Sequence, residues 1–194
     1  MKLFYNGPSP YGRKVIVAAH EFGLIDRLEL VPTDPWKHSE EMVAVNPGGK
    51  VPALIKENGS VVTESTTICE YFMFLASGNL KFDEQYVEIL ARAAMGQGII
   101  DAGYTAVIEG RRPADKRWQD WVDRQMSALY RLLAAAQTKP GRFDIGDISL
   151  ACGLAYLDFR LPQVIWRQSQ PALASWLDEV ALRPSMQKTD PRVK

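Results

Sequence analysis

Residues 46–54 contain the first arrangement whose residue types could do chemistry. A turn-forming Asn-Pro-Gly-Gly leads into Lys50, Val51 and Pro52, and apolar residues that indicate a strand follow. Proline has no N–H for a sheet ladder, so it is expected at a strand's start, edge or bulge. Cis peptide bonds are nearly confined to X-Pro, which makes Pro52 a candidate cis-proline. This entrance would leave the backbone of Val51 free to pair with an extended ligand. Taken alone, an irregular strand entrance is the simpler interpretation.

Glu64 and Ser65 form a second polar pair, at the predicted start of a helix. The backbone N–H groups of a helix N-terminus bind anions, and a neighbouring carboxylate can pair with an amine. An ordinary helix start explains the same two residues.

Ser9 is the third residue of interest, because Ser9-Pro10 opens a predicted helix. Serine is a good N-cap and proline is favoured at the first helical position, so a structural role accounts for both. The same position would allow the Ser9 hydroxyl to donate a hydrogen bond to a bound anion.

The elements that must position these residues form a small α/β unit over residues 1–78. Strands alternate with helices and close with a hairpin around Asn58-Gly59, in the order β-α-β-α-β-β-α. The predicted strands are 2–5, 28–31, 51–55 and 61–63, and the predicted helices are 9–23, 39–43 and 65–76.

After a linker at 79–84 the strand pattern disappears, and residues 85–194 are predicted to form an all-helical domain. The predicted helices are 85–109, 115–136, 148–157 and 172–182, with a capping arrangement at 144–147, a break at Pro140-Gly141 and a frayed tail from Gln187. The first of these helices carries Gly96, Gly98 and Gly103, each of which costs ~1 kcal/mol relative to alanine. That helix therefore needs tertiary support, or uses the gaps for close packing.

Composition limits the classes of function. The 194 residues suffice for one large domain or two small ones, and 23 basic residues balance 23 acidic ones, which disfavours nucleic acid and anionic membranes as partners. The N-terminus lacks a secretory apolar stretch, and the two cysteines lie apart in apolar surroundings, so we expect a reduced cytoplasmic protein. The two histidines, His20 and His38, have no second ligand at metal spacing, and we expect no metal.

The order of these motifs resembles the cytosolic glutathione transferase superfamily over nearly the whole chain. Three groups of residues carry the resemblance: Ser9-Pro10-Tyr11-Gly12-Arg13-Lys14, then Lys50-Val51-Pro52 with Glu64-Ser65, and finally Asp147 within Asp144-Ile145-Gly146-Asp147-Ile148. The resemblance, to serine-type members like those of bacteria, implies a thioredoxin-like N-terminal domain with cis-Pro52. It also implies a helical-bundle C-terminal domain and a homodimer.

Glutathione, an extended peptide with an amine, two carboxylates and a thiol, is then the expected co-substrate, with no permanently bound cofactor. The Val51 backbone would add to its cysteinyl main chain, as in strand addition. Ser65 and the nearby amides would take the γ-glutamyl carboxylate, and Glu64 the amine. The residues predicted to bind glutathione are Ser9, Lys50, Val51, Glu64 and Ser65, with Lys37 or His38 as alternatives to Lys50 for the glycyl carboxylate.

Ser9 is the predicted catalytic residue. A thiol with a pKa near ~8.5 is mostly protonated at neutral pH. A hydrogen bond to a charged acceptor is worth ~1.5–3 kcal/mol, which would lower that pKa by about one to two pH units and favour the nucleophilic thiolate. Tyr5 offers a second hydroxyl at a strand end, but we favour Ser9. The absence of cysteine before Cys69 disfavours thiol-disulfide exchange.

The predicted reaction is conjugation of glutathione to a small hydrophobic electrophile, as in detoxification. Placement suggests a second-substrate pocket formed by Tyr11, Tyr104, Ile108 and Arg112. The resemblance further implies Asp101 as a candidate for reaching the amine of the partner subunit's glutathione. The main alternative is a non-catalytic glutathione-binding or ligand-binding scaffold of the same fold. An isomerase or a dehalogenase would share the site.

Overall fold

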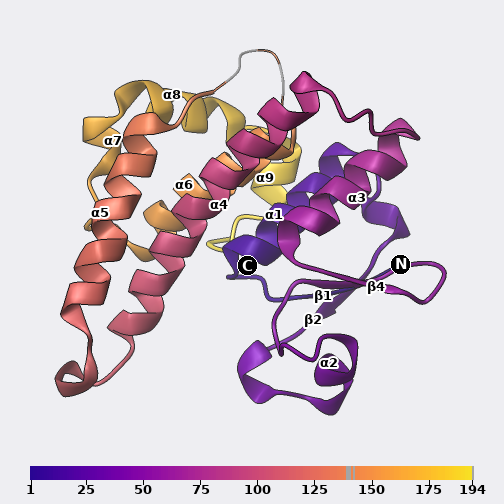
Figure 1. Cartoon of the computed structure of the whole chain (residues 1–194), viewed down its shortest axis with the longest axis horizontal. Helices are drawn as coiled ribbons and strands as arrows, with labels where there is room; N and C mark the ends of the chain where they lie inside the picture. The colour runs from indigo at the N-terminus through magenta and orange to yellow at the C-terminus, as the bar shows by residue number, and fades with distance from the viewer. Residues whose placement is uncertain (139–140, 142, 194) are drawn as a thin grey trace. The chain divides into compact units, whose positions relative to one another are not determined.

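The computed structural model describes residues 1–138, 141 and 143–193. The chain forms two compact units (Figure 1). The first contains Met1–Tyr86 together with the C-terminal segment that begins at Pro184, and the second contains Val87–Arg183. The break expected at Pro140 falls outside the described residues.

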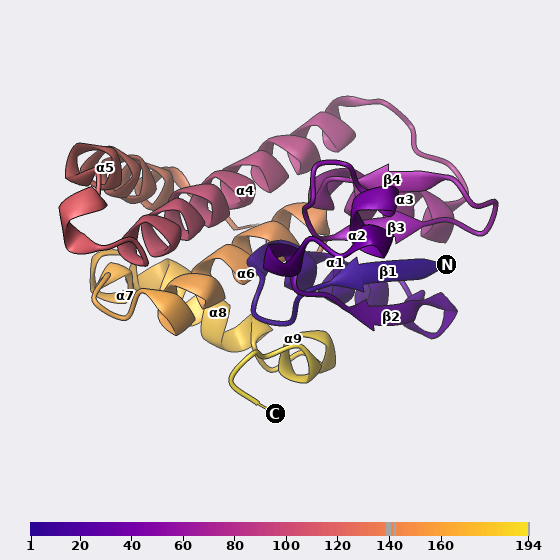
Figure 2. The same ribbon diagram turned by 90° about the horizontal axis from the view of Figure 1, so that it is seen from below.

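The first unit is built on a four-stranded mixed sheet in the order β2-β1-β3-β4 (Figure 2). β1 runs parallel to β2 and antiparallel to β3, and β3 and β4 form the predicted antiparallel hairpin. The strands are β1 (Lys2–Tyr5), β2 (Glu29–Pro32), β3 (Ala53–Ile55) and β4 (Val61–Thr63). The helices of this unit are α1 (Pro10–Glu21), η1 (Ile25–Arg27), η2 (Pro35–Lys37), α2 (Glu40–Val45), α3 (Ser65–Ser77) and α9 (Pro184–Lys188). The predicted β-α-β-α-β-β-α order is confirmed.

Alternation along β1 divides the core of this unit between the two faces of the sheet. Phe4 packs against Met42 of α2 and Ala53 of β3. Leu3 therefore points to the opposite face, where α1 and α3 lie, and it is fully buried with its ladder partner Leu54. Figure 1 shows α1 and α3 on one side of the sheet and α2 on the other.

Helix α1 begins and ends where its sequence predicts. The Ser9 side chain caps it by accepting the Gly12 N–H, Pro10 occupies the first turn, and Gly23 adopts a φ of 67° just after the end. The helix is buried nearly all round, and its buried residues include Arg13 and Lys14. Two charged side chains thus enter the interior and require polar partners there.

The C-terminal segment supplies the partner for Arg13. The guanidinium donates to the Met186 carbonyl at 3.0 Å and to the Thr189 hydroxyl at 3.3 Å. The Ser185 hydroxyl also donates to the Glu21 carboxylate. The predicted fraying from Gln187 is therefore wrong, because a polar tail can be held by a buried cation that needs its acceptors.

The second unit is all-helical among its described residues. Its elements are α4 (Glu84–Gly110, which begins within the first unit), η3 (Ala114–Lys116), α5 (Gln119–Ala135), α6 (Ile145–Arg160), α7 (Trp166–Ser169) and α8 (Pro171–Val180). The helix predicted from residue 115 begins only at Gln119, because the buried Glu109 carboxylate accepts the Trp118 N–H at 3.0 Å and holds a turn there. Within the described part of the chain, no helix is long and apolar enough to cross a bilayer.

The glycines of α4 allow it to pack closely against α6. A Cβ at Gly96 would lie 2.4 Å from the backbone nitrogen of Leu150, and one at Gly103 would lie 3.0 Å from the Leu157 side chain. Of the two explanations for these glycines, close packing therefore applies at both positions.

An ion-pair network fixes the start of α6. Asp144 and Asp147 form a reciprocal capping box, and Arg92 of α4 pairs with both carboxylates, reaching Asp147 at 2.7 Å. Asp147 is fully buried. The network therefore satisfies the helix start and ties α4 to α6.

We predict that Asp147→Ala will lower the free energy of unfolding by about 3 kcal/mol, because removing one member of a buried ion pair leaves the other charge uncompensated. Urea unfolding followed by tryptophan fluorescence measures the loss. Asp178→Ala is the matched control, since Asp178 pairs with Arg167 at 2.9 Å with both side chains more than one-third exposed. It should cost less than ~1 kcal/mol. Equal losses would contradict the prediction.

Candidate functional site

The register of the sheet brings three loops of the first unit to the same end of the sheet, where β1 and β4 finish and β3 begins. We call this end the site edge. The last row of the ladder joins Phe4 to Ala53 and Ala53 to Thr63. Extending this register places the residues after β1, before β3 and after β4 at the same end of the sheet. These residues are the Ser9 loop, Val51 and Glu64-Ser65.

The backbone of Val51 lies at this end of the sheet, and its side chain packs into the core of the unit. The Val51–Pro52 peptide bond is cis, and β3 begins at Ala53, later than the strand predicted from residue 51. The Val51 side chain packs against the Phe4, Met42 and Ala53 cluster. Among the hydrogen bonds of the described residues, none engages the Val51 backbone. An extended ligand could therefore pair with it.

The turn before Val51 is shaped by Asn46. Its side-chain amide donates to the Lys50 carbonyl at 2.7 Å, and its side-chain oxygen accepts the Gly48 N–H at 3.0 Å. Gly49 has a φ of 62° and packs against the His38 ring, so a side chain there would be both strained and crowded. Lys50 itself is exposed and can reach an anion at the edge.

Glu64 caps α3 with its own carboxylate. It has a φ of 73° and accepts hydrogen bonds from the N–H groups of Thr66 and Thr67 and from the Ser65 hydroxyl. Burial acts to raise the pKa of Glu64, but these hydrogen bonds and the charge of Lys14 outweigh it and leave the pKa below its usual value. Glu64 is therefore an anion at neutral pH, available to an amine.

The Ser9 hydroxyl is half-buried at the N-terminus of α1. It accepts the Gly12 N–H at 3.3 Å, so its own hydrogen can still be donated to a ligand. Tyr5 is also half-buried and ends β1, where its carbonyl accepts the Thr33 N–H at 2.7 Å. Both residues thus lie at this end of the sheet, and the choice of the Ser9 hydroxyl remains a prediction.

The residues predicted for the second substrate fall in different units. Tyr11 lies on α1, whereas Tyr104 and Ile108 lie on α4 and Arg112 follows it. Arg112 pairs with Glu109 at 3.0 Å. A pocket assembled from all four remains a prediction.

Asp101 and Tyr156 also belong to the second unit. Asp101 is exposed on α4 and accepts a hydrogen bond from Gln97 at 3.0 Å, and its contact across a dimer remains a prediction.

Tyr156 was not singled out from the sequence. Burial raises its pKa to about 12, against the opposing charge of Arg160, so it is a neutral phenol. An aromatic residue within an apolar helix is expected to be a core residue, so the sequence gives no signal of this raised pKa.

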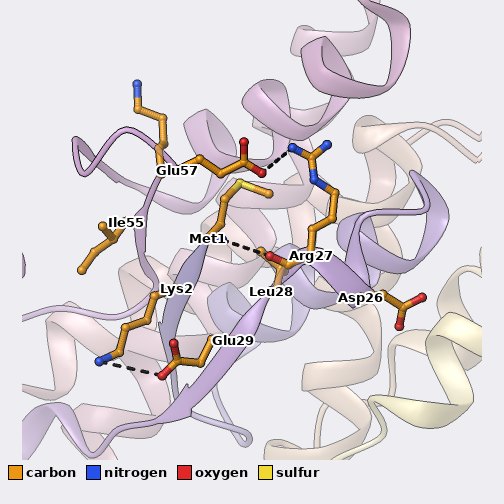
Figure 3. Close-up of a pocket in the computed structure, with 9 residues that line it drawn as sticks. Met1, Lys2, Asp26, Arg27, Leu28, Glu29, Ile55 and Glu57 are labelled. Atoms are coloured by element: carbon orange, nitrogen blue, oxygen red, sulfur yellow. Dashed lines mark hydrogen bonds and ion pairs between the residues drawn. The ribbon is translucent and has the colours of Figure 1, made fainter.

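A cavity of about 540 Å³ lies at the other end of the sheet (Figure 3). Much of its charged rim is internally paired, since Lys2 lies 4.0 Å from Glu29, Arg27 pairs with Glu57, and the Met1 amine donates to the Arg27 carbonyl. It is lined by Met1, Lys2, Asp26, Arg27, Leu28, Glu29, Ile55, Lys56 and Glu57. None of the predicted site residues lines it. We therefore assign the site from the register of the strands rather than from this cavity.

Lys14 appears in the sequence only as the last residue of the Ser9–Lys14 motif, and no role was predicted for it. It is fully buried between α1 and α3, and its ammonium donates to the Thr66 hydroxyl at 3.0 Å. The only signal in the sequence was the run of apolar residues that follows Lys14 in the predicted helix. Lysine is so often exposed that this signal carries little weight.

Comparison with known proteins identifies the family. The family model for the glutathione S-transferase N-terminal domain matches residues 8–73, and the model for the C-terminal domain matches residues 119–179. The chain belongs to the glutathione S-transferase family.

Relatives cover the chain from end to end. A glutathione transferase family member from Pseudomonas fluorescens Pf-5, solved with bound glutathione, is 38% identical with a TM-score of 0.92 over 99% of each chain. A glutathione S-transferase from Methylobacterium radiotolerans JCM 2831, in complex with glutathione sulfonate, is 30% identical with a TM-score of 0.88 over 100% of this chain and 95% of that one. The uncharacterised GST-like protein YibF of Escherichia coli K12 is 29% identical over 98% of both chains.

We predict that Glu64→Gln will lower the melting temperature by about 2–3 °C at pH 7, because a weaker cap costs about 1 kcal/mol. The pKa of Glu64 is lower in the folded protein than its usual value of 4.5. The ionised carboxylate therefore stabilises the fold at pH values above 4.5. That contribution disappears as the pH falls through the lowered pKa. Thermal unfolding between pH 3 and 8 should therefore show the two proteins converging below about pH 4.5. A difference that persists unchanged at pH 3 would contradict this cause.

Proposed function

We propose that this protein is a glutathione transferase that binds glutathione at the edge of the sheet and conjugates it to a small hydrophobic electrophile. The observation that supports it most is the backbone of Val51, which lies outside the ladder at the end of the sheet where β4 leads into α3. Relatives covering the whole chain were solved with glutathione or glutathione sulfonate bound, in agreement with this proposal.

Each end of glutathione has a chemical complement at this edge. The Val51 backbone would hold the cysteinyl main chain by strand addition. Ser65 and the N-terminus of α3 would accept the γ-glutamyl carboxylate, and Glu64 would accept the amine. Lys50 would meet the glycyl carboxylate.

Ser9 would stabilise the thiolate of bound glutathione. Its hydroxyl is available as a donor, because its recorded hydrogen bond is one that it accepts. A charge-assisted hydrogen bond together with the N-terminal end of the α1 dipole favours the anion without any proton transfer to serine. The serine thus acts on the substrate's pKa rather than as a base.

The electrophile would bind next to the thiol, with Tyr11, Tyr104, Ile108 and Arg112 as walls. We place the protein in the cytoplasm, in a detoxifying role, as a homodimer with Asp101 near the partner's glutathione.

A non-catalytic glutathione-binding or ligand-binding scaffold is the second candidate function. The half-buried position of Ser9 and its bond to Gly12 also suit a purely structural cap. Retention on immobilised glutathione followed by a conjugation assay with a general electrophile separates the two. Retention with turnover supports the enzyme, and retention without turnover supports the scaffold.

We predict that Ser9→Ala will lower the conjugation rate at pH 7 by about tenfold or more, since the lost hydrogen bond is worth ~1.5–3 kcal/mol. The Kd for glutathione should change little, because the peptide is held mainly at other points. Steady-state kinetics over pH 6–9 should show the apparent thiol pKa rising toward ~8.5 in the variant.

Tyr5→Phe is the matched control, because it removes the other hydroxyl at the end of β1. It should retain most of the activity. If Tyr5→Phe abolishes turnover while Ser9→Ala leaves it intact, the assignment of Ser9 is overturned.

A further inference from the structure

The start of α3 concentrates more negative charge than an ordinary anion site. Glu64 already places its carboxylate on the N–H groups of Thr66 and Thr67. In the proposed complex, a second carboxylate, from the γ-glutamyl group, would bind beside it at Ser65. Two carboxylates this close repel each other, and the ligand's single amine neutralises only one of them.

Lys14 is placed to supply the missing positive charge. Its side chain is fully buried behind the α3 start, and its ammonium donates to the Thr66 hydroxyl at 3.0 Å. The same Thr66 donates its N–H to Glu64 at 2.9 Å, so one residue connects the buried cation to the cap. A buried charge is poorly screened and therefore acts strongly over a short distance.

The positive charge of Lys14 acts to lower the pKa values of two nearby carboxylates. Its charge is one of the causes that lower the pKa of Glu64. Glu70, six residues further along α3, has a pKa raised by burial and by Glu64, and Lys14 opposes that rise. Lys14 thus faces two acidic residues of α3, and the ligand carboxylate would be a third anion within its reach.

We propose that Lys14 is a positioning residue for the γ-glutamyl carboxylate: its buried charge lets Glu64 and the ligand carboxylate share the start of α3. This inference rests on the proposed function, because it assumes glutathione at that edge. Lys14 also lies on the helix capped by Ser9 and bonds to the helix capped by Glu64, so it couples the thiol end of the site to the amine end.

The experiment compares two ligands by titration calorimetry at pH 7 and low salt. One is glutathione, and the other is γ-aminobutyryl-cysteinylglycine, which keeps the amine, thiol and glycyl carboxylate but lacks the γ-glutamyl carboxylate. Lys14→Met should raise the Kd for glutathione about tenfold or more, equivalent to about 1.4 kcal/mol. The Kd for the analogue should change less than about twofold, because its complex lacks the second anion.

Two further variants separate charge from packing. Lys14→Arg keeps the charge and should restore most of the preference for glutathione over the analogue. Glu64→Gln removes the repelling carboxylate while Lys14 remains, so it should increase the ratio of glutathione affinity to analogue affinity. That variant keeps the proposal falsifiable if Lys14→Met does not fold, as judged by circular dichroism. Lys2→Met, which removes a partly exposed lysine paired with Glu41, controls for net charge.

The outcomes are distinct. If the unaltered protein binds no glutathione, the proposed function fails. If it binds glutathione and Lys14→Met weakens both ligands equally or neither, the inference about Lys14 is overturned. An unchanged affinity ratio in Glu64→Gln overturns it as well.

Discussion

The end of the ladder between β1, β3 and β4 is the constraint on which the rest of the site depends. The pairs Phe4–Ala53 and Ala53–Thr63 form the last row, and the chain beyond this row leaves the β1–β3–β4 ladder at the same end of the sheet. Because side chains alternate along a strand, a slip of one residue would exchange the buried and exposed faces. The core that sets the register therefore also sets the position of the site.

This constraint explains why so much of the site is backbone. Val51 is held by its side chain, which packs into the cluster around Phe4 and Met42, and its main-chain groups are left outside the ladder. Substitutions at Val51 that keep its volume preserve the anchor and hence the presentation of the backbone. The fold can thus keep the backbone of Val51 available for pairing whichever polar residues surround it.

Much of the fold could be predicted from the sequence, because its signals are local. Ser9-Pro10 and Gly23 mark the ends of α1, and Asn58-Gly59 marks the hairpin, each through the backbone conformation that it favours. The start of α5 was missed because a tertiary contact decides it: Glu109 binds the Trp118 N–H. The ordered C-terminal segment was missed for the same reason, since its partner is Arg13, far away in the chain.

The site divides in the same way. Its members that lie at turns and caps can be read from residue type, whereas Lys14 cannot, because its burial depends on how α1 packs against α3. Burying an ammonium removes its hydration, which costs free energy even where protein groups accept its hydrogen bonds. Such a cost is understandable if the charge acts on something beyond the core. In this unit, the groups that sense it are the carboxylates of α3, next to the edge where the backbone of Val51 is exposed for pairing.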